Sequence, residues 1–221
     1  MRKLGLFLVL VGVAVLAGTA LAANPGSVKY RARHLPFPFS FSHPTEWKAR
    51  FAGYINPPYG TPQYLIVALS TERLHRPVCH AVSLPNGDTT EECNRILDTL
   101  PAGGVYVEWW LDASASGDPK LRSTPGNVTH VDGALAKMVI DPTSKTAGWI
   151  CPKNTTSSVQ LYIAGTAQAG SPLGRPLVYM YACTNTSNLP GFMAQLLPMI
   201  RSVRVGECSH TTRVGSCSKH R

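Results

Sequence analysis

Apolar and polar side chains alternate along several short stretches of this chain, which is the pattern of half-buried β-strands. In FPFSFS, Phe37, Phe39 and Phe41 share one side, and Pro38 confines the predicted strand to a sheet edge because proline cannot donate a ladder hydrogen bond. Further strands are predicted at 49–55, 64–69, 105–111, 135–140, 159–165 and 177–183, with a closing strand at 202–205. The pattern therefore predicts a chain dominated by antiparallel sheet.

The segment TTEECNRILDTL, residues 89–100, shows helical spacing instead. Thr89 and Glu92 stand three residues apart, the spacing of a capping box that satisfies free amides at a helix start. The apolar side of this predicted helix holds Cys93, Ile96, Leu97 and Leu100.

A second helix is predicted after Asn188, a good N-cap, with Pro198 disturbing its last turn. Its apolar side holds Phe192, Met193, Leu196, Leu197 and Ile200. The predicted fold class is therefore α+β, mainly an antiparallel sheet flanked by two or more helices and stabilised by disulfides.

The first residues have the composition of a secretory signal peptide. Arg2 and Lys3 precede an uncharged apolar run at 4–18, and small residues follow up to Ala22. The run is shorter than the about 20 apolar residues that a bilayer-spanning helix needs, so we expect cleavage near Ala22 and a secreted chain without a transmembrane helix. A retained anchor is the alternative. We predict a signal peptide at 1–22, an N-terminal lead at 23–36, a single α+β domain at 37–206 and a basic C-terminal tail at 207–221.

Basic residues exceed acidic ones after this leader is removed. Of the 21 lysines and arginines, Arg2 and Lys3 belong to the leader, which leaves 19 against 12 acidic side chains and a net charge of +7. Such a charge favours anionic partners, here a cell-envelope polymer or glycan. In the last 21 residues, Arg201, Arg204, Arg213, Lys219 and Arg221 stand against Glu207 alone. The sequence thus points to the tail as a contact region, although a merely solvated charge run is the alternative.

The chain contains six cysteines, an even set that predicts three disulfides in an exported protein. The expected pairs are Cys79–Cys93 across a turn-rich loop, Cys151–Cys183 between neighbouring strands, and Cys208–Cys217 around a small loop in the tail. His75 and His80 flank Cys79, so a thiolate activated by His80 is the rival interpretation of that cluster. No zinc-ligand spacing occurs among these cysteines, and we expect no metal.

The stretch GGVYVEWWLD raises the question of a binding face. Because side chains alternate along a strand, Trp109 is predicted to lie in the core, while Tyr106, Glu108 and Trp110 share the opposite face. Two aromatic rings that flank a carboxylate can form a stacking platform for a sugar ring or an apolar ligand, with Glu108 accepting a hydroxyl proton. The alternative is that helices cover this side and that the two rings simply pack beneath them.

Four stretches of the sequence carry a resemblance to a known family. They are the early aromatic strand followed by HPTEW, the stretch YLIVALST with Glu72-Arg73-Leu74, the stretch LPAGGVYVEWW, and the closing GFMAQLLPMIRSVRV. Over residues 37–205 the chain resembles exported, largely uncharacterised bacterial proteins with the PsbP-like α/β sandwich fold. The resemblance implies an antiparallel sheet with helices on its sides and a binding or assembly role rather than an enzymatic one. The six cysteines and the basic tail depart from that family.

Motifs that would indicate an enzyme do not occur in the sequence. It contains no G-x-S-x-G elbow, H-E-x-x-H helix, phosphate-cradling loop or dinucleotide fingerprint, and we expect no cofactor. The leading hypothesis is a secreted, non-catalytic binding or cell-envelope-associated protein, with no nucleic-acid partner because the basic residues are not interleaved with aromatics. The alternatives are a secreted hydrolase that uses Glu108 or an unrecognised His/Asp pair, and redox exchange through Cys79 and Cys93.

Overall fold

The computed structural model describes residues 26–33, 35, 37–50, 55–56, 63–76, 78–83, 87, 89–93, 95–112, 121–143, 145, 150–165 and 176–206. The predicted signal peptide at 1–22 and the tail at 207–221, with the predicted Cys208–Cys217 pair, lie outside these residues.

The described chain is mainly antiparallel sheet, as the alternating pattern predicts. Its large, eight-stranded sheet has the order β3-β5-β8-β12-β11-β10-β9, and β4 also pairs with β5. These strands are β3 (Lys48–Arg50), β4 (Ile55–Asn56), β5 (Gln63–Ser70), β8 (Val105–Asp112), β9 (Asn127–Val131), β10 (Ala134–Asp141), β11 (Ser157–Ala164) and β12 (Leu177–Thr184). The strand predicted at 49–55 corresponds to the two short strands β3 and β4.

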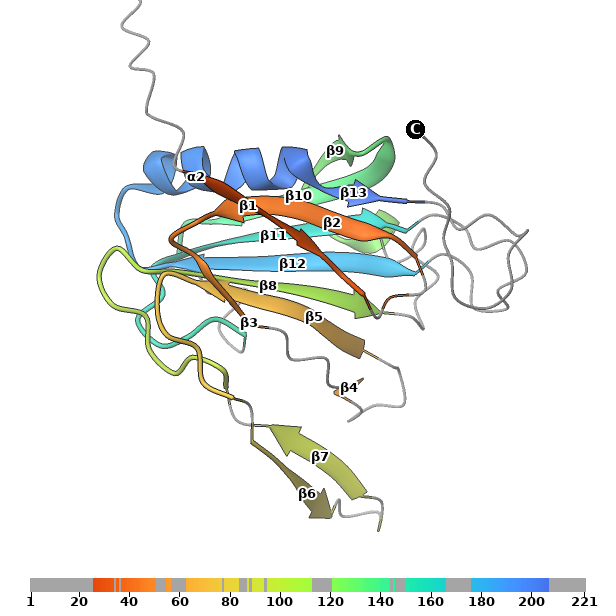
Figure 1. Ribbon diagram of the computed structural model, residues 1–221, viewed down its shortest axis with the longest axis vertical. Helices are drawn as coiled ribbons and strands as arrows, with labels where there is room; N and C mark the ends of the chain where they lie inside the picture. Colours follow the sequence, from red (N-terminus) through yellow and green to blue (C-terminus); the bar gives the residue numbers. More distant parts are fainter. Residues whose placement is uncertain are drawn as a thin grey trace, which may run out of the picture.

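A small, three-stranded sheet crosses in front of the large one, with a helix beside it (Figure 1). It consists of β1 (Ser27–Arg31), β2 (Phe39–Pro44) and β13 (Arg204–Val205), and the helix is α2 (Leu189–Ser202). The strand β1 lies within the predicted N-terminal lead at 23–36, where no strand was predicted.

The prediction that Pro38 places its strand at an edge is wrong. β2 lies at the centre of the small sheet, between β1 and β13. Pro38 precedes the first residue of β2, where no N–H is required, and its carbonyl accepts a hydrogen bond from the Gly206 N–H at 2.8 Å. The lack of an N–H on Pro38 therefore removes no hydrogen bond from the sheet at this position.

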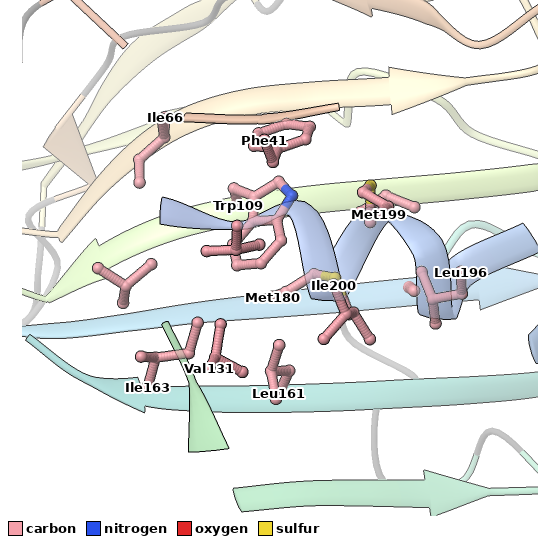
Figure 2. Packing of buried hydrophobic residues seen from close by; sticks show 14 of the residues in the cluster. Phe41, Ile66, Trp109, Val131, Leu161, Ile163, Met180, Leu196, Met199 and Ile200 are labelled. Atoms are coloured by element: carbon pink, nitrogen blue, oxygen red, sulfur yellow. The ribbon is translucent and has the colours of Figure 1, made fainter. Parts of the chain in front are cut away.

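The main hydrophobic core lies between the large sheet on one side and the small sheet with α2 on the other. Phe39 and Phe41 of β2 pack on Trp109 of β8, with ring centroids 5.2 and 5.4 Å apart. Figure 2 shows the Trp109 ring near Phe41, with Leu196, Met199 and Ile200 of α2 over the same layer. The predicted core position of Trp109, whose side chain is 0% exposed, is confirmed.

The helix predicted after Asn188 is confirmed as α2. The Asn188 Oδ1 atom accepts a hydrogen bond from the Gly191 N–H at 2.9 Å, which satisfies one of the free amides at the helix start. The helix continues through Pro198 to Ser202, and β13 follows it almost immediately. Elsewhere in the described chain, residues 121–123 are also helical.

The helix predicted over residues 89–100 is wrong. Its first half forms β7 (Thr89–Cys93), which pairs with β6 (Cys79–Ser83) in a separate hairpin that extends away from the sheets (Figure 1). The two strands are joined through Gly87, which has a φ of 86°, a conformation that glycine adopts at little cost in energy. The Asn86-Gly87 dipeptide, a strong hairpin signal, therefore outweighs the helical spacing of Thr89 and Glu92.

Candidate functional site

The structure brings together the three predicted site residues on one face of β8. The Tyr106 hydroxyl donates a hydrogen bond to Oε1 of Glu108, and the Trp110 Nε1–H donates to Oε2 of the same carboxylate at 2.9 Å. Both oxygens of Glu108 are thus occupied by the aromatic side chains two residues before and after it. The alternation of strand side chains produces this arrangement, because residues i and i+2 project to the same face.

Tyrosines from neighbouring strands extend this face into an aromatic row. On β12, Tyr179 lies opposite Trp110 and Tyr181 lies opposite Glu108. The Trp110 and Tyr179 rings are stacked with an interplanar angle of 3° and centroids 6.3 Å apart. Tyr162 of β11 continues the row beside Tyr179, and the centroids of these two rings lie 6.2 Å apart. Sequence reasoning missed these tyrosines, because only the β8–β12 register places them next to Glu108.

The row is covered by loops rather than by helices. Glu108 is 7% exposed, and a second apolar cluster closes over it. The members of this cluster that come from the covering loops are Leu74, Ile96, Leu97, Leu100, Ile150 and Cys151. Among the described residues, three loop segments and no helix cover this face, so the alternative that helices lie over it is not what the described structure shows.

Backbone hydrogen bonds join the covering loops to one another. The Lys153 N–H donates to the Asp98 carbonyl at 2.8 Å, and the Leu100 N–H donates to the Lys153 carbonyl at 3.0 Å. In addition, the Arg95 Nη1 donates to the Cys151 carbonyl at 2.7 Å. These bonds fix residues 95–100 and 151–153 as one layer.

The predicted Cys151–Cys183 disulfide is confirmed and fixes this layer to the sheet. The two Cα atoms lie 5.7 Å apart, and both side chains are buried. Cys183 belongs to β12, as expected, whereas Cys151 lies in the covering loop and not at the end of a strand. The bridge therefore joins a loop to a strand rather than two neighbouring strands.

Burial and hydrogen bonding have opposite effects on the pKa of Glu108. Burial raises the pKa of this carboxyl above its ordinary value of 4.5, because desolvation disfavours the charged form. The hydrogen bonds from Tyr106 and Trp110 and the positive charge of Arg95 lower it, and burial has the larger effect. Burial, and to a smaller extent neighbouring Tyr162, also raises the pKa of Tyr181. The face is thus a desolvated environment that favours neutral groups.

A small cavity with both polar and apolar lining opens in the loop layer outside this face. Its volume is about 260 Å³, and its lining includes Arg95, Asp98, Lys153, Asn154 and Thr155. Glu108 is not among its described lining residues. The cavity therefore offers two cations and one carboxylate to a small polar molecule, without access to the buried carboxylate beneath.

The predicted Cys79–Cys93 pair lies in the β6–β7 hairpin. The register places Cys79 directly opposite Cys93, and His80 opposite Glu92. Opposite residues of an antiparallel pair have Cα atoms about 4.5–5.5 Å apart, within the range that a disulfide spans. The side chains of Cys79 and Cys93 lie outside the described part of the structure, so the bond itself stays a prediction.

Within the described residues, no group of three or more His, Cys, Asp or Glu side chains has the geometry to hold a metal ion. In the same residues, no helix is both long enough and apolar enough to span a bilayer.

Comparison with known proteins gave no match. No protein-family model fits the chain, and no curated protein or solved structure is significantly similar to it.

Proposed function

We propose that this chain is a secreted, non-catalytic binding protein of the cell envelope whose partners are anionic envelope polymers or glycans. The net charge of +7 after removal of the predicted leader supports this proposal, because a basic surface attracts polyanions. The Cys151–Cys183 disulfide is compatible with an extracellular location, where thiols oxidise and stay oxidised.

One observation carries the preference for binding over hydrolysis. Both oxygens of Glu108 accept hydrogen bonds from side chains of the same strand, beneath a layer of loops. A general acid or base must come within hydrogen-bond reach of the group whose proton it transfers. The arrangement supports a structural role for Glu108, which holds Tyr106 and Trp110 in place.

The second candidate function is a secreted hydrolase that uses Glu108. Burial raises the pKa of this carboxyl, and a raised carboxyl pKa is the property that a general acid needs at neutral pH. On this hypothesis the covering loops open to admit a glycan onto the Tyr106, Glu108 and Trp110 face, which is also the ligand-binding face predicted from the sequence.

We also propose that the fold is a variant of the PsbP-like α/β sandwich. The antiparallel large sheet and the closing succession of α2 and β13 support this relation. The loop layer held by Cys151–Cys183 is the feature that this chain would add to such a sandwich.

Retention on an immobilised anionic polymer tests the binding proposal. The chain that begins at Ala23 is passed over polygalacturonate, polyphosphate and a crude cell-wall preparation at low and at high salt. We expect retention at low salt and release at high salt, because salt screens exposed charges. Failure to bind any of the three at low salt would overturn the proposal.

Product release tests the hydrolase. The wild-type chain and Glu108→Gln are incubated with neutral and anionic glycans, and reducing ends are counted. We expect none above background from either protein. Release by the wild type that disappears in Glu108→Gln would establish the hydrolase instead.

A further inference from the structure

The outward face of the small sheet gathers basic side chains. Along β2 the phenylalanines are buried in the core, while Ser40 and Ser42 turn to the other side. The register places Lys29 opposite Ser42 and Arg31 opposite Ser40 on the β1 side, and Arg204 opposite Ser40 on the β13 side. Residues opposite one another project to the same face of a sheet, so these three cations surround two small serines.

The basic side chains of this face are exposed. Lys29, Arg31 and Arg204 all lie at the surface, as does Arg201 in the last turn of α2. The strands β1, β2 and β13 contain no aspartate or glutamate. The charged side chains that these strands place on the face are therefore all cationic, and they come from β1 and β13.

One acidic residue, Asp132, meets this face at its rim. Its Oδ1 atom lies 3.7 Å from the Arg204 Nε, and its Oδ2 atom accepts a hydrogen bond from the Val205 N–H at 2.9 Å. Asp132 comes from the turn between β9 and β10, so it holds β13 against the large sheet. It offsets one of the three cations of the face and leaves the face positive.

The spacing of the cations fits a linear partner. Strands in a sheet lie about 4.8 Å apart, so the backbones of Arg31 and Arg204 are separated by about 10 Å across β2. Along β1, Lys29 and Arg31 stand two residues apart, which is about 7 Å. The small serines between them leave a flat surface over which long basic side chains can reach a chain of regularly spaced negative charges.

We propose that this basic face, formed by Lys29, Arg31 and Arg204 with the exposed Arg201 of the last turn of α2 next to Arg204, binds a linear polyanion of the cell envelope, either carboxylated or phosphodiester-linked. The inference rests on the proposed binding function and moves its main site from the tail to the small sheet. The tail at 207–221, which contains Arg213, Lys219 and Arg221, lies outside the described residues and is not part of this face.

The chemistry of the face favours such a polymer over single-stranded nucleic acid. Proteins that bind single strands without sequence preference stack bases on exposed aromatic rings. Here the aromatic side chains of β1 and β2 point inward. The ring of Tyr30 packs 5.2 Å from that of Phe41, and its hydroxyl donates to the Ile66 carbonyl at 3.1 Å. The face thus offers charge without a stacking platform.

A matched pair of double variants tests the proposal. Lys29→Gln with Arg31→Gln removes two charges from the basic face, and Arg73→Gln with Arg76→Gln removes two exposed charges from a loop on the opposite side of the large sheet. Affinity for polygalacturonate and for polyphosphate is measured by titration over a range of salt concentrations. Equal melting temperatures confirm that both variants fold.

We expect the face variant to bind about tenfold more weakly at low salt, with a salt dependence reduced by about two charges. The loop variant should stay within about threefold of the wild type. The polymer that binds more tightly identifies the anionic group that the face recognises.

Three outcomes would overturn the inference. Equal weakening by both variants would mean that only net charge matters, and the proposed function would survive. Loss of binding only on neutralising Arg213, Lys219 and Arg221 would return the site to the tail. Tighter binding of single-stranded DNA than of either polymer would exclude the proposed partner. A wild-type chain that binds none of the polymers would instead contradict the proposed function itself.

Discussion

The adjacent residues Trp109 and Trp110 are both buried, yet the two faces of the large sheet bury them in different ways. Trp109 lies among Phe39 and Phe41 beneath regular structure, and within the described residues its Nε1 has no hydrogen-bond partner. The Trp110 Nε1 donates to Glu108 beneath loops that a disulfide holds. The first face is closed mainly by apolar packing, together with a few hydrogen bonds such as those from the Tyr30 hydroxyl to the Ile66 carbonyl and from the Val205 N–H to Asp132. The second face is closed by packing, by polar pairing and by a covalent bond.

The difference shows what each cover requires. The small sheet and α2 satisfy most of their backbone groups within their own ladders and turns, so apolar side chains supply most of their contact with the first face. The loops over the second face have no extended ladder of their own, and they depend on bonds such as the one from the Lys153 N–H to the Asp98 carbonyl. We therefore expect the two faces to respond differently to substitution.

The largest expected loss of stability follows from removing a large side chain from the core at the first face. Trp109→Ala removes a fully buried ring, and large-to-small core changes of this kind cost about 3–5 kcal/mol in the free energy of unfolding. Chemical denaturation measures the change. Trp109→Phe is the control: because no hydrogen bond of the indole is lost, it should cost much less. Similar losses for the two variants would show that the indole makes a polar contact.

Removing the Cys151–Cys183 disulfide should loosen the loops that cover the second face. In Cys151→Ala with Cys183→Ala, a cross-link between residues 32 apart in sequence is lost. Loop-closure entropy predicts a loss of about 3–4 kcal/mol. Hydrogen exchange should then rise in residues 95–100 and 150–156 but not in α2. Equal exchange in both covers would contradict the separate roles of the two faces.

The polar pairing within the second face should show an intermediate effect. Tyr106→Phe removes the hydroxyl that donates to the buried Glu108 carboxyl group, and leaving a buried polar group without its partner costs about 1–3 kcal/mol. The matched variant Tyr162→Phe loses a hydroxyl that donates to neutral Gln160, which contributes about 0.5–1.5 kcal/mol. Denaturation of both variants at neutral pH checks the order. A larger loss for Tyr162→Phe would mean that Glu108 is not held by Tyr106 in solution.

The buried carboxyl should also give the second face a pH dependence. Because burial raises the pKa of Glu108 above 4.5, the folded state keeps the proton longer than the unfolded state. The contribution of this group is complete below the unfolded pKa and is lost as pH rises through the folded pKa. The free energy of unfolding of the wild type relative to Glu108→Gln should therefore fall over that interval. If the free energy of unfolding of the wild type relative to Glu108→Gln rose with pH instead, the hydrogen bonds and the charge of Arg95 would outweigh burial and lower the pKa of Glu108.

The sequence predicted the parts of this fold that depend on local pattern. Short apolar runs bounded by turn residues located β5, β8 and β12, and the capping residue Asn188 located α2. The helix predicted over residues 89–100 was wrong because Gly87 lies in a hairpin turn, and a local turn decided the pairing of the strands on either side. The strand β1 was missed because only Tyr30 of its residues turns toward the core.

The candidate site was predicted in part. The shared face of Tyr106, Glu108 and Trp110 follows from alternation along one strand, and the structure shows the three in contact. The cover over this face depends on contacts between distant segments, such as Arg95 with Cys151. No local pattern records such contacts, and for the same reason Tyr179 and Tyr181 were not recognised as neighbours of Glu108.

Binding of one polyanion by three proteins tests the central claim most directly, namely that the chain acts through its basic surface and not through the buried carboxylate. The wild type, Glu108→Gln, and Lys29→Gln with Arg31→Gln are titrated with the tighter-binding polymer at low salt. The account predicts that Glu108→Gln binds within about twofold of the wild type, while the face variant binds about tenfold more weakly. The reverse order, with binding lost in Glu108→Gln and kept in the face variant, would contradict it.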